Sequence, residues 1–323
     1  MNEAKRQEYL KKYIRTGSDV ILPKEKNPFP QMKTDTFKLD VTPDFGGFGG
    51  NVIWTSIFEP VAMQPEPAVS EHSRYISCFG GIPTDFTKLH GEVEITLGAS
   101  SSDMKMFKIA EPFSAYIKKG MLYSISITKL NDPRLPVYYS ELIFGEKAPV
   151  TDRFTDDDIA GFEQYIKTGT SIVANYPGKE QVPCPIMIMD NSLFTSNDII
   201  RRTWMPITKA HIMAKNSHTH AFTEFLVCHG SDPENINDLG GVIEFTIGDS
   251  PETLETFRID KATQFMLPPN FWHSPLIFRE VNDPEKPMIF CEVSYAEDLV
   301  QNATLDNFVT EDALIPAEGD YTW

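Results

Sequence analysis

The chain has 323 residues, with 29 Lys and Arg against 46 Asp and Glu, which gives a formal net charge of −17 at pH 7. This acidity argues against binding nucleic acid or anionic membranes through general electrostatics. No apolar run approaches the roughly 20 residues of a membrane-spanning helix, and the first residues lack the apolar core of a signal peptide. We therefore expect a cytoplasmic protein that contacts neither nucleic acid nor membrane.

The chain opens on a segment that we expect to be an amphipathic helix. Four large side chains fall on one side of it at helical spacing: Tyr9, Leu10, Tyr13 and Ile14. A second helix is expected over residues 155–166, where Thr155 can serve as the N-cap and acidic residues fill the first turn.

The rest of the chain is mostly typical of β-strands. Polar and apolar residues alternate with period two over residues 92–97 and 242–247, which indicates strands with one buried face. Further strands are expected at residues 137–143 and 288–293. Many short strands separated by turn residues predict a β-sandwich or a small barrel.

The second half of the chain repeats the first at an offset of 150 residues, because GEVEITLG at residues 91–98 aligns with GVIEFTIG at residues 241–248. Five further residues meet an identical residue without a gap: Trp54, Met63, Cys78, Gly80 and Phe107. The unit has the length of a domain and is far longer than the roughly 20–50 residues of a solenoid repeat. We therefore expect one domain in residues 1–150 and a second in residues 151–323.

Four residues of the second half have the side chains of a metal site. His218, His220 and Glu224 share parity along the chain, so all three point to the same side if they lie on one strand. His273 must then reach them from a neighbouring strand. Three imidazoles and one carboxylate suit one divalent transition metal, which could be Fe, Mn, Ni, Co or Zn.

The first half has lost these four residues together. At the same offset the chain carries Ala68, Ser70, Arg74 and Tyr123, and this set does not preserve the ligands. Four scattered surface residues would have no reason to be lost as a unit. We therefore expect a single metal, bound in the second half only, with Tyr123 filling the corresponding space in the first half.

At these residues the chain resembles the cupin superfamily in its two-domain form, the bicupins. The first cupin motif is H-x-H-x(3,4)-E followed by a glycine, and here it consists of His218, His220, Glu224 and Gly230. The resemblance implies a mainly all-β fold of two jelly-roll barrels with short flanking helices. It also implies that the first domain is a degenerate cupin without metal ligands and that the second binds the metal.

The second cupin motif, P-x-G-x-x-H, is matched by Pro268, Asn270 and His273. Asn270 replaces the glycine, which is a mild change because Asn tolerates the left-handed backbone better than most residues. Three other residues that often accompany the motifs are also replaced, without touching the ligands: Ile212, Ala262 and Ile277.

The resemblance leaves the reaction open, because one fold hosts many activities. Four protein ligands on a six-coordinate ion leave two positions for a small oxygen-rich ligand, such as an enediol, a dicarbonyl, or a hydroxy or keto acid. The first hypothesis is a metal-dependent enzyme of the dioxygenase type. The alternatives are a non-catalytic metal- or ligand-binding or sensing protein and a cupin isomerase or decarboxylase. No catalytic residue is assigned, and a homodimer is expected.

The remaining candidates are expected to have structural roles. His229 is expected in a loop, and His211 is not expected to bind the metal. Four polar residues are expected to be structural or exposed: Gln264, Arg279, Glu292 and Tyr295. Four aromatic residues are expected in the core: Phe222, Phe225, Phe265 and Trp272. Four cysteines are expected to be reduced and buried: Cys78, Cys184, Cys228 and Cys291. The acidic tail after about residue 300 has no predicted position.

Overall fold

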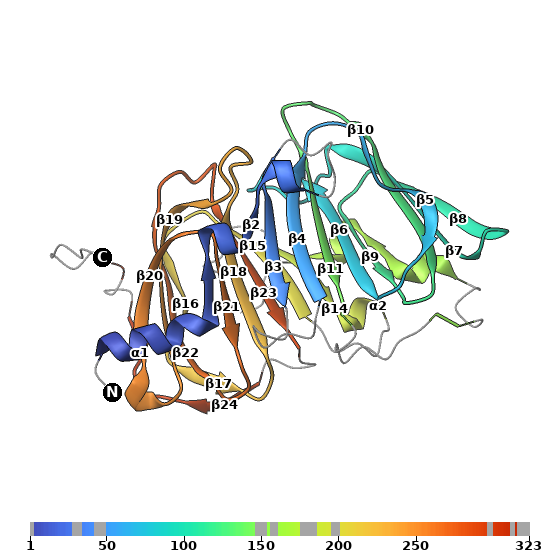
Figure 1. Cartoon of the computed structure of the whole chain (residues 1–323). Coiled ribbons are helices and arrows are strands. Elements are labelled where there is room, and N and C mark those ends of the chain that lie inside the picture. The colour runs from blue at the N-terminus through green and yellow to red at the C-terminus, as the bar shows by residue number, and fades with distance from the viewer. Residues whose placement is uncertain are drawn as a thin grey trace.

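Two β-sandwiches lie side by side in the computed structural model, each built from one half of the chain (Figure 1). The structure describes residues 3–27, 34–41, 50–145, 154–155, 161–174, 186–194, 201–295, 300–310 and 314. The mainly all-β prediction is confirmed. None of the helices in this described part of the chain combines the length and the hydropathy that a membrane-spanning helix requires.

The first sandwich pairs a seven-stranded sheet with a four-stranded sheet. The larger sheet has the order β12 (Ile166–Thr168), β9 (Phe113–Ile117), β6 (Arg74–Gly80), β11 (Val137–Ile143), β4 (Gly50–Ile57), β3 (Thr36–Val41) and β2 (Ile21–Leu22). The smaller sheet has the order β5 (Val61–Val69), β10 (Leu122–Leu130), β7 (Gly91–Ser100) and β8 (Asp103–Ile109).

The second sandwich repeats this arrangement. Its seven-stranded sheet has the order β1 (Ile14–Thr16), β21 (Thr263–Leu267), β18 (Glu224–Gly230), β23 (Met288–Ser294), β15 (Arg201–Ile207), β14 (Ile186–Asp190) and β13 (Val173–Ala174). The other sheet has the order β20 (Glu255–Lys261), β19 (Asp238–Gly248), β22 (Trp272–Val281), β17 (His218–His220) and β24 (Gln301–Thr304), and β16 (His211–Ala214) pairs with β22. The four predicted strands correspond to β7, β19, β11 and β23.

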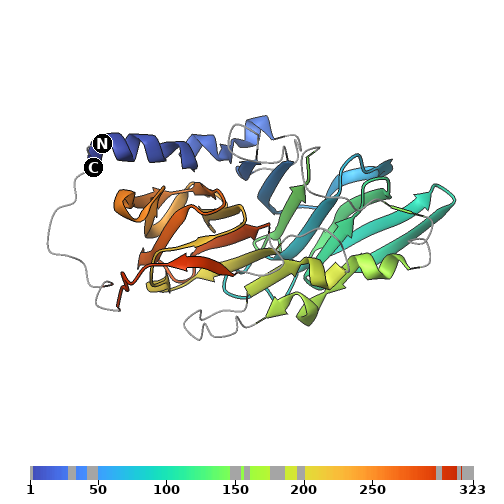
Figure 2. The same cartoon turned by 90° about the horizontal axis from the view of Figure 1, so that it is seen from below.

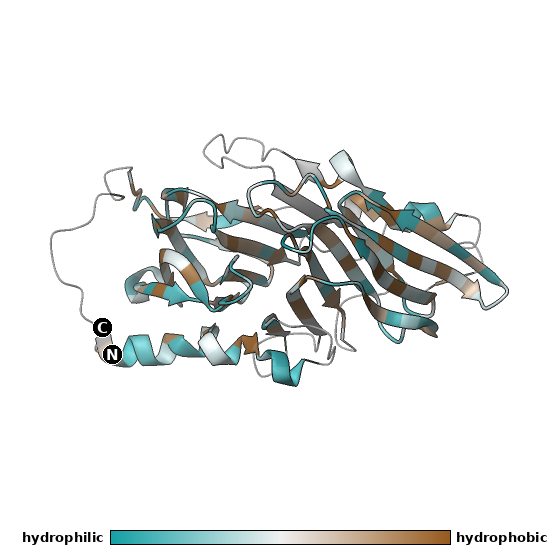
Figure 3. Ribbon diagram, turned by 90° about the horizontal axis from the view of Figure 1, so that it is seen from above, coloured by the Kyte–Doolittle hydropathy of each residue, from teal (hydrophilic) through white to brown (hydrophobic). Residues whose placement is uncertain are grey.

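Alternation of residue type explains why these segments are strands. Along β7 and β19, buried residues alternate with partly exposed ones, and Figure 3 shows the same alternation as bands of both colours along the strands. Residues two apart therefore share a face, and the apolar face closes each sandwich.

A short strand from each half, which we call its arm, pairs with a sheet of the other half. Helix α1 (Glu3–Leu10) continues into a 3₁₀ turn and then β1, which pairs with β21 of the second half. Figure 2 shows α1 running beside that half. In return, β12 pairs with β9 of the first half. The domain division at residue 150 remains a prediction, and the pairing shows that the arms cross it.

The N-terminal helix is confirmed, although it is shorter than the apolar pattern predicts. It ends at Leu10, which is buried in the core of the second half, whereas Tyr9 is exposed. Tyr13 and Ile14 pack against the same core from the 3₁₀ turn and from β1.

The helix predicted over residues 155–166 is wrong where the structure describes it, and residues 156–160 lie outside the described part. Residues 162–165 form a 3₁₀ turn, and β12 begins at Ile166. The reason is tertiary: the backbone of β12 joins the free edge of β9, with Ile166 opposite Ala115, and this pairing overrides the local preference for helix.

The two large sheets contact each other through aromatic side chains. Trp54 of β4 meets Trp204 of β15 with ring centroids 6.4 Å apart, and Phe79 of β6 lies 5.6 Å from Trp204. His229, the counterpart of Phe79, lies 4.7 Å from Trp54 and is 1% exposed. The prediction that His229 lies in a loop is therefore wrong, because this residue belongs to β18 and packs in the layer between the halves.

Three of the four cysteines are free and buried, as predicted: Cys78, Cys228 and Cys291. Cys184 lies outside the described residues.

Candidate metal centre

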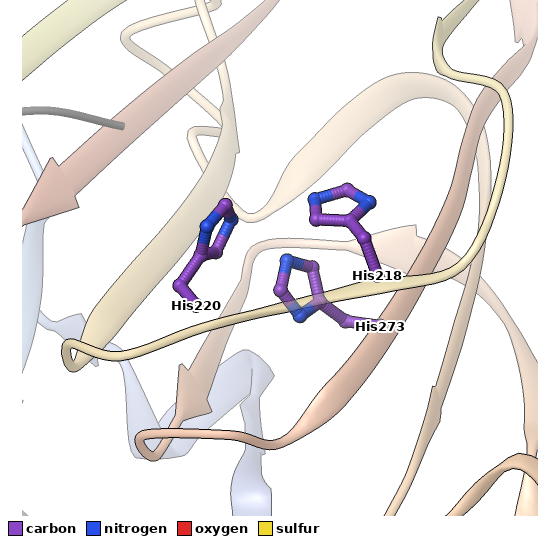
Figure 4. A group of neighbouring side chains, drawn as sticks. All are labelled: His218, His220 and His273. Atoms are coloured by element: carbon purple, nitrogen blue, oxygen red, sulfur yellow. The ribbon is translucent and has the colours of Figure 1, made fainter. Parts of the chain in front are cut away.

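The three histidines of the sequence motifs converge inside the second half. His218 and His220 lie on β17, and His273 lies on the adjacent strand β22, directly opposite His218 in the register. One ring nitrogen of each histidine lies within 4.8 Å of the others. Figure 4 shows the three rings turned toward one shared space. Among the described residues this is the one cluster of three or more potential metal ligands.

Glu224 also reaches this space, but not from the strand that its parity predicted. The chain turns at residues 221–223, and Glu224 opens β18, which belongs to the other sheet of the sandwich. Its Oε2 atom lies 3.6 Å from Nε2 of His273. The site is therefore built across the two sheets, with imidazoles from one and a carboxylate from the other.

Backbone carbonyl groups orient all three imidazoles. Nδ1 of His218 lies 2.9 Å from the carbonyl oxygen of Asn216, and Nδ1 of His273 lies 3.0 Å from that of Phe271. Nδ1 of His220 lies 3.2 Å from the carbonyl oxygen of Val300. A carbonyl only accepts, so each Nδ1 must donate, and each Nε2 is left with the lone pair that a metal ligand needs.

Burial favours the neutral form of two of these imidazoles, those of His220 and His273. The four side chains of the cluster are all buried, with 3–8% of each residue exposed. Burial lowers the pKa of His220, and burial together with the neighbouring His218 holds the pKa of His273 well below its usual range. Neutral imidazoles beside a carboxylate fit the donor set of a divalent transition metal.

A cavity of about 290 Å³ opens beside the cluster. Its wall includes the three histidines and Glu224, together with Glu292 and Gln301. Glu292 was a polar candidate that we expected to be structural or exposed, and the structure instead places it, buried, in the wall of this cavity. A signal was present: Glu141 is its counterpart, since Glu141 pairs with Ile76 and Glu292 with Leu226, residues that the offset equates.

The other polar candidates have the structural roles that were expected. Gln264 is fully buried on β21, and Arg279 forms an ion pair with Glu244 at 2.6 Å. Tyr295 packs against Phe225 with centroids 6.3 Å apart. His211 stacks on Phe278, away from the cluster.

Two of the four aromatic candidates are core residues as predicted. Phe225 and Phe265 are 0% and 1% exposed. Phe222 and Trp272 are only partly buried, so the prediction is wrong for them. Phe222 instead stacks on His220 with ring centroids 4.6 Å apart.

The corresponding space in the first half holds an arginine. The Nη1 atom of Arg74, the counterpart of Glu224, donates to Tyr123 Oη at 2.7 Å and to Glu141 Oε1 at 2.8 Å. Nε of Arg74 donates to Ser70 Oγ at 3.0 Å. Burial alone would lower the pKa of Arg74, but the Glu141 carboxylate together with Tyr123 and Tyr139 outweighs burial, and the pKa is raised. Tyr123 lies in this space as expected, and the Arg74 guanidinium lies over its ring, 4.9 Å from the ring centre.

The C-terminal tail lies along the strand of the same chain that carries His218 and His220. β24 pairs with β17, so that Thr304 lies opposite His218. Asn307 continues this contact, accepting a hydrogen bond from the Ser217 backbone amide at 2.9 Å. The carbonyl group that orients His220 comes from this tail, and the question that the sequence left open is answered for residues 300–310.

Comparison with known proteins identifies the fold. No protein-family model matches the sequence, and the search of curated proteins found no match. Among solved structures, the oxalate decarboxylase of Bacillus subtilis matches with a TM-score of 0.51 at 12% identity, covering 90% of this chain and 80% of that chain. Two further structures of oxalate decarboxylase match with TM-scores of 0.50, at 12% and 13% identity, over the same shares. The chain has a cupin fold.

The cupin motifs can now be placed on this fold. Asn270, which replaces the motif glycine, has φ 62°, and its counterpart Gly120 has φ 97°. Both backbone amides donate to the equivalent carbonyl, that of His220 in one half and that of Ser70 in the other. The left-handed turn is thus kept in both halves. The three other replaced motif residues are buried and are not part of the histidine cluster: Ile212, Ala262 and Ile277.

Proposed function

We propose that the second half binds one divalent transition metal through Nε2 of His218, His220 and His273 and through a carboxylate oxygen of Glu224. The observation that carries this proposal is the convergence of three buried imidazoles, each with its Nδ1 turned to a backbone carbonyl. The metal remains one of Fe, Mn, Ni, Co and Zn, because all five accept this donor set.

We propose further that the protein is a metal-dependent enzyme for a small oxygen-rich substrate. When bound, the metal would supply a Lewis acid that polarises a carbonyl or carboxylate oxygen. The residues of the chain orient this centre, exclude bulk water from it and leave a small cavity on one side. Neither Phe222 nor Trp272 lines that cavity, which favours an enzyme over a metal-bound binding or sensing protein whose ligand set these residues would seal.

Decarboxylase-type chemistry is the reaction class that we now favour over dioxygenase-type cleavage. The support is the shared fold with oxalate decarboxylase, together with a cavity whose size suits a small acid. Dioxygenase-type cleavage remains the second candidate, because a redox-active ion in the same ligand set could also act on oxygen.

The first half is proposed to be a degenerate cupin that serves as a scaffold. The support is Arg74, whose guanidinium stands among the counterparts of the ligands and bonds to Ser70, Tyr123 and Glu141. A homodimer and a cytoplasmic location are also proposed, the latter supported by three free buried cysteines.

Metal analysis tests the site. Elemental analysis of protein purified without added metal should find about one metal per chain in the wild type and a loss of metal in His220→Ala and Glu224→Ala. Ser70→Ala, which changes the counterpart of His220, is the matched control and should keep the metal. Equal metal content in wild type and both ligand variants, with the fold intact by circular dichroism, would exclude the site.

The reaction class is tested on protein loaded separately with each metal. Small keto, hydroxy and dicarboxylic acids are offered with and without oxygen, and carbon dioxide release and oxygen uptake are measured together. Carbon dioxide release without equivalent oxygen uptake supports a decarboxylase, whereas uptake that matches the product supports a dioxygenase. Absence of both, in a protein that holds its metal, would favour the binding or sensing alternative.

A further inference from the structure

A second carboxylate stands beside the histidine cluster and has no role in the proposed ligand set. Glu292 is 9% exposed and lines the same cavity as the three histidines and Glu224. The Oγ atom of Ser294 lies 3.0 Å from Oε1 of Glu292 and 3.3 Å from Oε1 of Glu224. One hydroxyl group therefore lies within hydrogen-bond distance of both carboxylates, and they are close neighbours in the wall of the cavity.

The charge of this second carboxylate is balanced in one half of the protein but not in the other. Its counterpart Glu141 is paired with Arg74 at 2.8 Å. In the second half the position of Arg74 is taken by Glu224, and no Lys or Arg among the described residues is paired with Glu292. Lys215 is the one Lys or Arg in the described lining of the cavity, and its ammonium lies 5.7 Å from the centre of the Phe308 ring in the tail.

The charges of the site limit what can bind there. A divalent ion with Glu224 alone would carry a net charge of about +1, and Glu292 would bring the total to about zero. A dianion such as oxalate would then leave two uncompensated negative charges in a buried site, where charge repulsion is weakly screened. A ligand that instead brings a hydroxyl group could donate it to Glu292 and satisfy a buried acceptor.

We propose that Glu292 selects the substrate, and this rests on the metal centre proposed above. The favoured substrate chelates the metal, carries at most one negative charge and donates a hydroxyl hydrogen to the Glu292 carboxylate, as a small hydroxy acid does. Dianionic acids without a hydroxyl group are disfavoured. The cavity of about 290 Å³ restricts this choice to small molecules.

Glycolate and oxalate test the proposal, because they are similar in size and both chelate through two oxygens. Protein loaded with Co(II) is titrated with each ligand, and the visible absorption of the metal reports binding without turnover. We expect Glu292→Gln to shift the ratio of the two dissociation constants toward oxalate by at least about tenfold. Glu292→Leu should shift this ratio in the same direction. Because leucine suits an apolar barrel interior, this second variant keeps the test possible if Glu292→Gln does not fold.

Glu285→Gln is the matched control, since it removes the same charge from an exposed residue that lines a different cavity. It should leave the ratio of the two dissociation constants unchanged. If both ligands change the Co(II) spectrum but the ratio in the Glu292 variants stays within twofold of the wild type, the selection by Glu292 is overturned and the metal centre stands. If the wild type does not retain Co(II), the metal centre itself fails.

Discussion

The same place in the two halves is filled in two different ways. In the first half one guanidinium, that of Arg74, bonds to Ser70, Tyr123 and Glu141. In the second half the corresponding positions hold Glu224, His220, His273 and Glu292, and the histidine nitrogens face one another at distances that suit a cation. Both halves thus surround one place with groups that favour positive charge.

The comparison teaches that a duplicated barrel can keep its topology while changing how its interior is stabilised. In the first half the buried carboxylate of Glu141 is paired with the guanidinium of Arg74, which belongs to the chain itself. The second half gathers three imidazoles and two carboxylates, which we propose to be completed by a bound metal. We therefore expect substitutions in the first half to alter stability without altering ligand binding, and substitutions at the cluster of the second half to alter ligand binding. Four experiments compare the two halves.

The largest effect is expected at the arginine of the first half. Arg74→Met leaves Glu141, which is 5% exposed, as an unpaired buried charge. Breaking a buried ion pair in this way typically destabilises a protein by about 3–5 kcal/mol. Urea unfolding of the metal-free protein measures the loss, and the double variant Arg74→Met, Glu141→Gln should recover most of it. A loss below about 1 kcal/mol would mean that the pair does not stabilise the first half.

The next effect concerns His229 and acid stability. Burial, and to a lesser extent the charge of Arg202, lower the pKa of His229 to about 4. In the unfolded chain the ordinary pKa of His229 is about 6.5. Between that pH and about pH 4 the imidazole is therefore protonated in the unfolded state and neutral in the folded state. The stabilisation is complete above about pH 6.5 and is lost as the pH falls toward 4, by about 3 kcal/mol in total.

Phe79 offers the matched substitution, because it occupies the same place in the first half and is fully buried. His229→Phe should remove this part of the acid sensitivity, which is measured as the difference between the urea stabilities of variant and wild type at pH 7 and at pH 4.5. The difference isolates His229 from the other buried histidines. An unchanged pH dependence in the variant would show that His229 is not responsible.

Much of the fold and the core of the site could be predicted from the sequence. Period-two alternation located strands such as β7 and β19, and the offset between the halves revealed the duplication. The histidine spacing identified three residues that meet in space, because a strand pair brings His218 and His273 opposite each other. Each of these features depends on the spacing of residues along the chain or on the comparison of two segments, so it can be predicted from the sequence alone.

The remaining features depend on contacts between distant segments. The sequence of β12 does not predict its pairing, because its partner strand β9 belongs to the other half of the chain. The strand of His229 and the turn before Glu224 depend on how two sheets pack together. The importance of Glu292 emerges only by comparison with Glu141, and the two correspond at an offset of 151 residues, which is the offset of the Asn-Asp-Pro segments at residues 131–133 and 282–284.

The third prediction is a stabilisation by metal that is confined to the second half. A metal that binds only the folded state at 100 times its dissociation constant adds about 2.7 kcal/mol to the free energy of unfolding. This gain should appear in the wild type and in Arg74→Met, and it should be absent in His220→Ala. Urea unfolding with and without added metal measures it. An equal gain in His220→Ala would place the metal elsewhere.

The smallest effect is expected at the left-handed turn that both halves keep. Asn270 has φ 62° and Gly120 has φ 97°, and a residue with a Cβ atom and no local polar group is disfavoured there by roughly 1–2 kcal/mol. Asn270→Ala should therefore destabilise the protein by about 1 kcal/mol, whereas Asn270→Gly should be close to neutral.

The same turn also allows a test of metal binding. The Asn270 backbone amide donates to the His220 carbonyl at 2.6 Å, so strain at Asn270 should lower metal affinity a few-fold. Gly120→Ala should destabilise the first half by a similar amount and leave metal affinity unchanged, because that turn holds Ser70 and not a ligand. Isothermal titration with Co(II) and urea unfolding of all three variants provide both quantities. A loss of metal affinity in Gly120→Ala equal to that in Asn270→Ala would show that the two halves do not act separately.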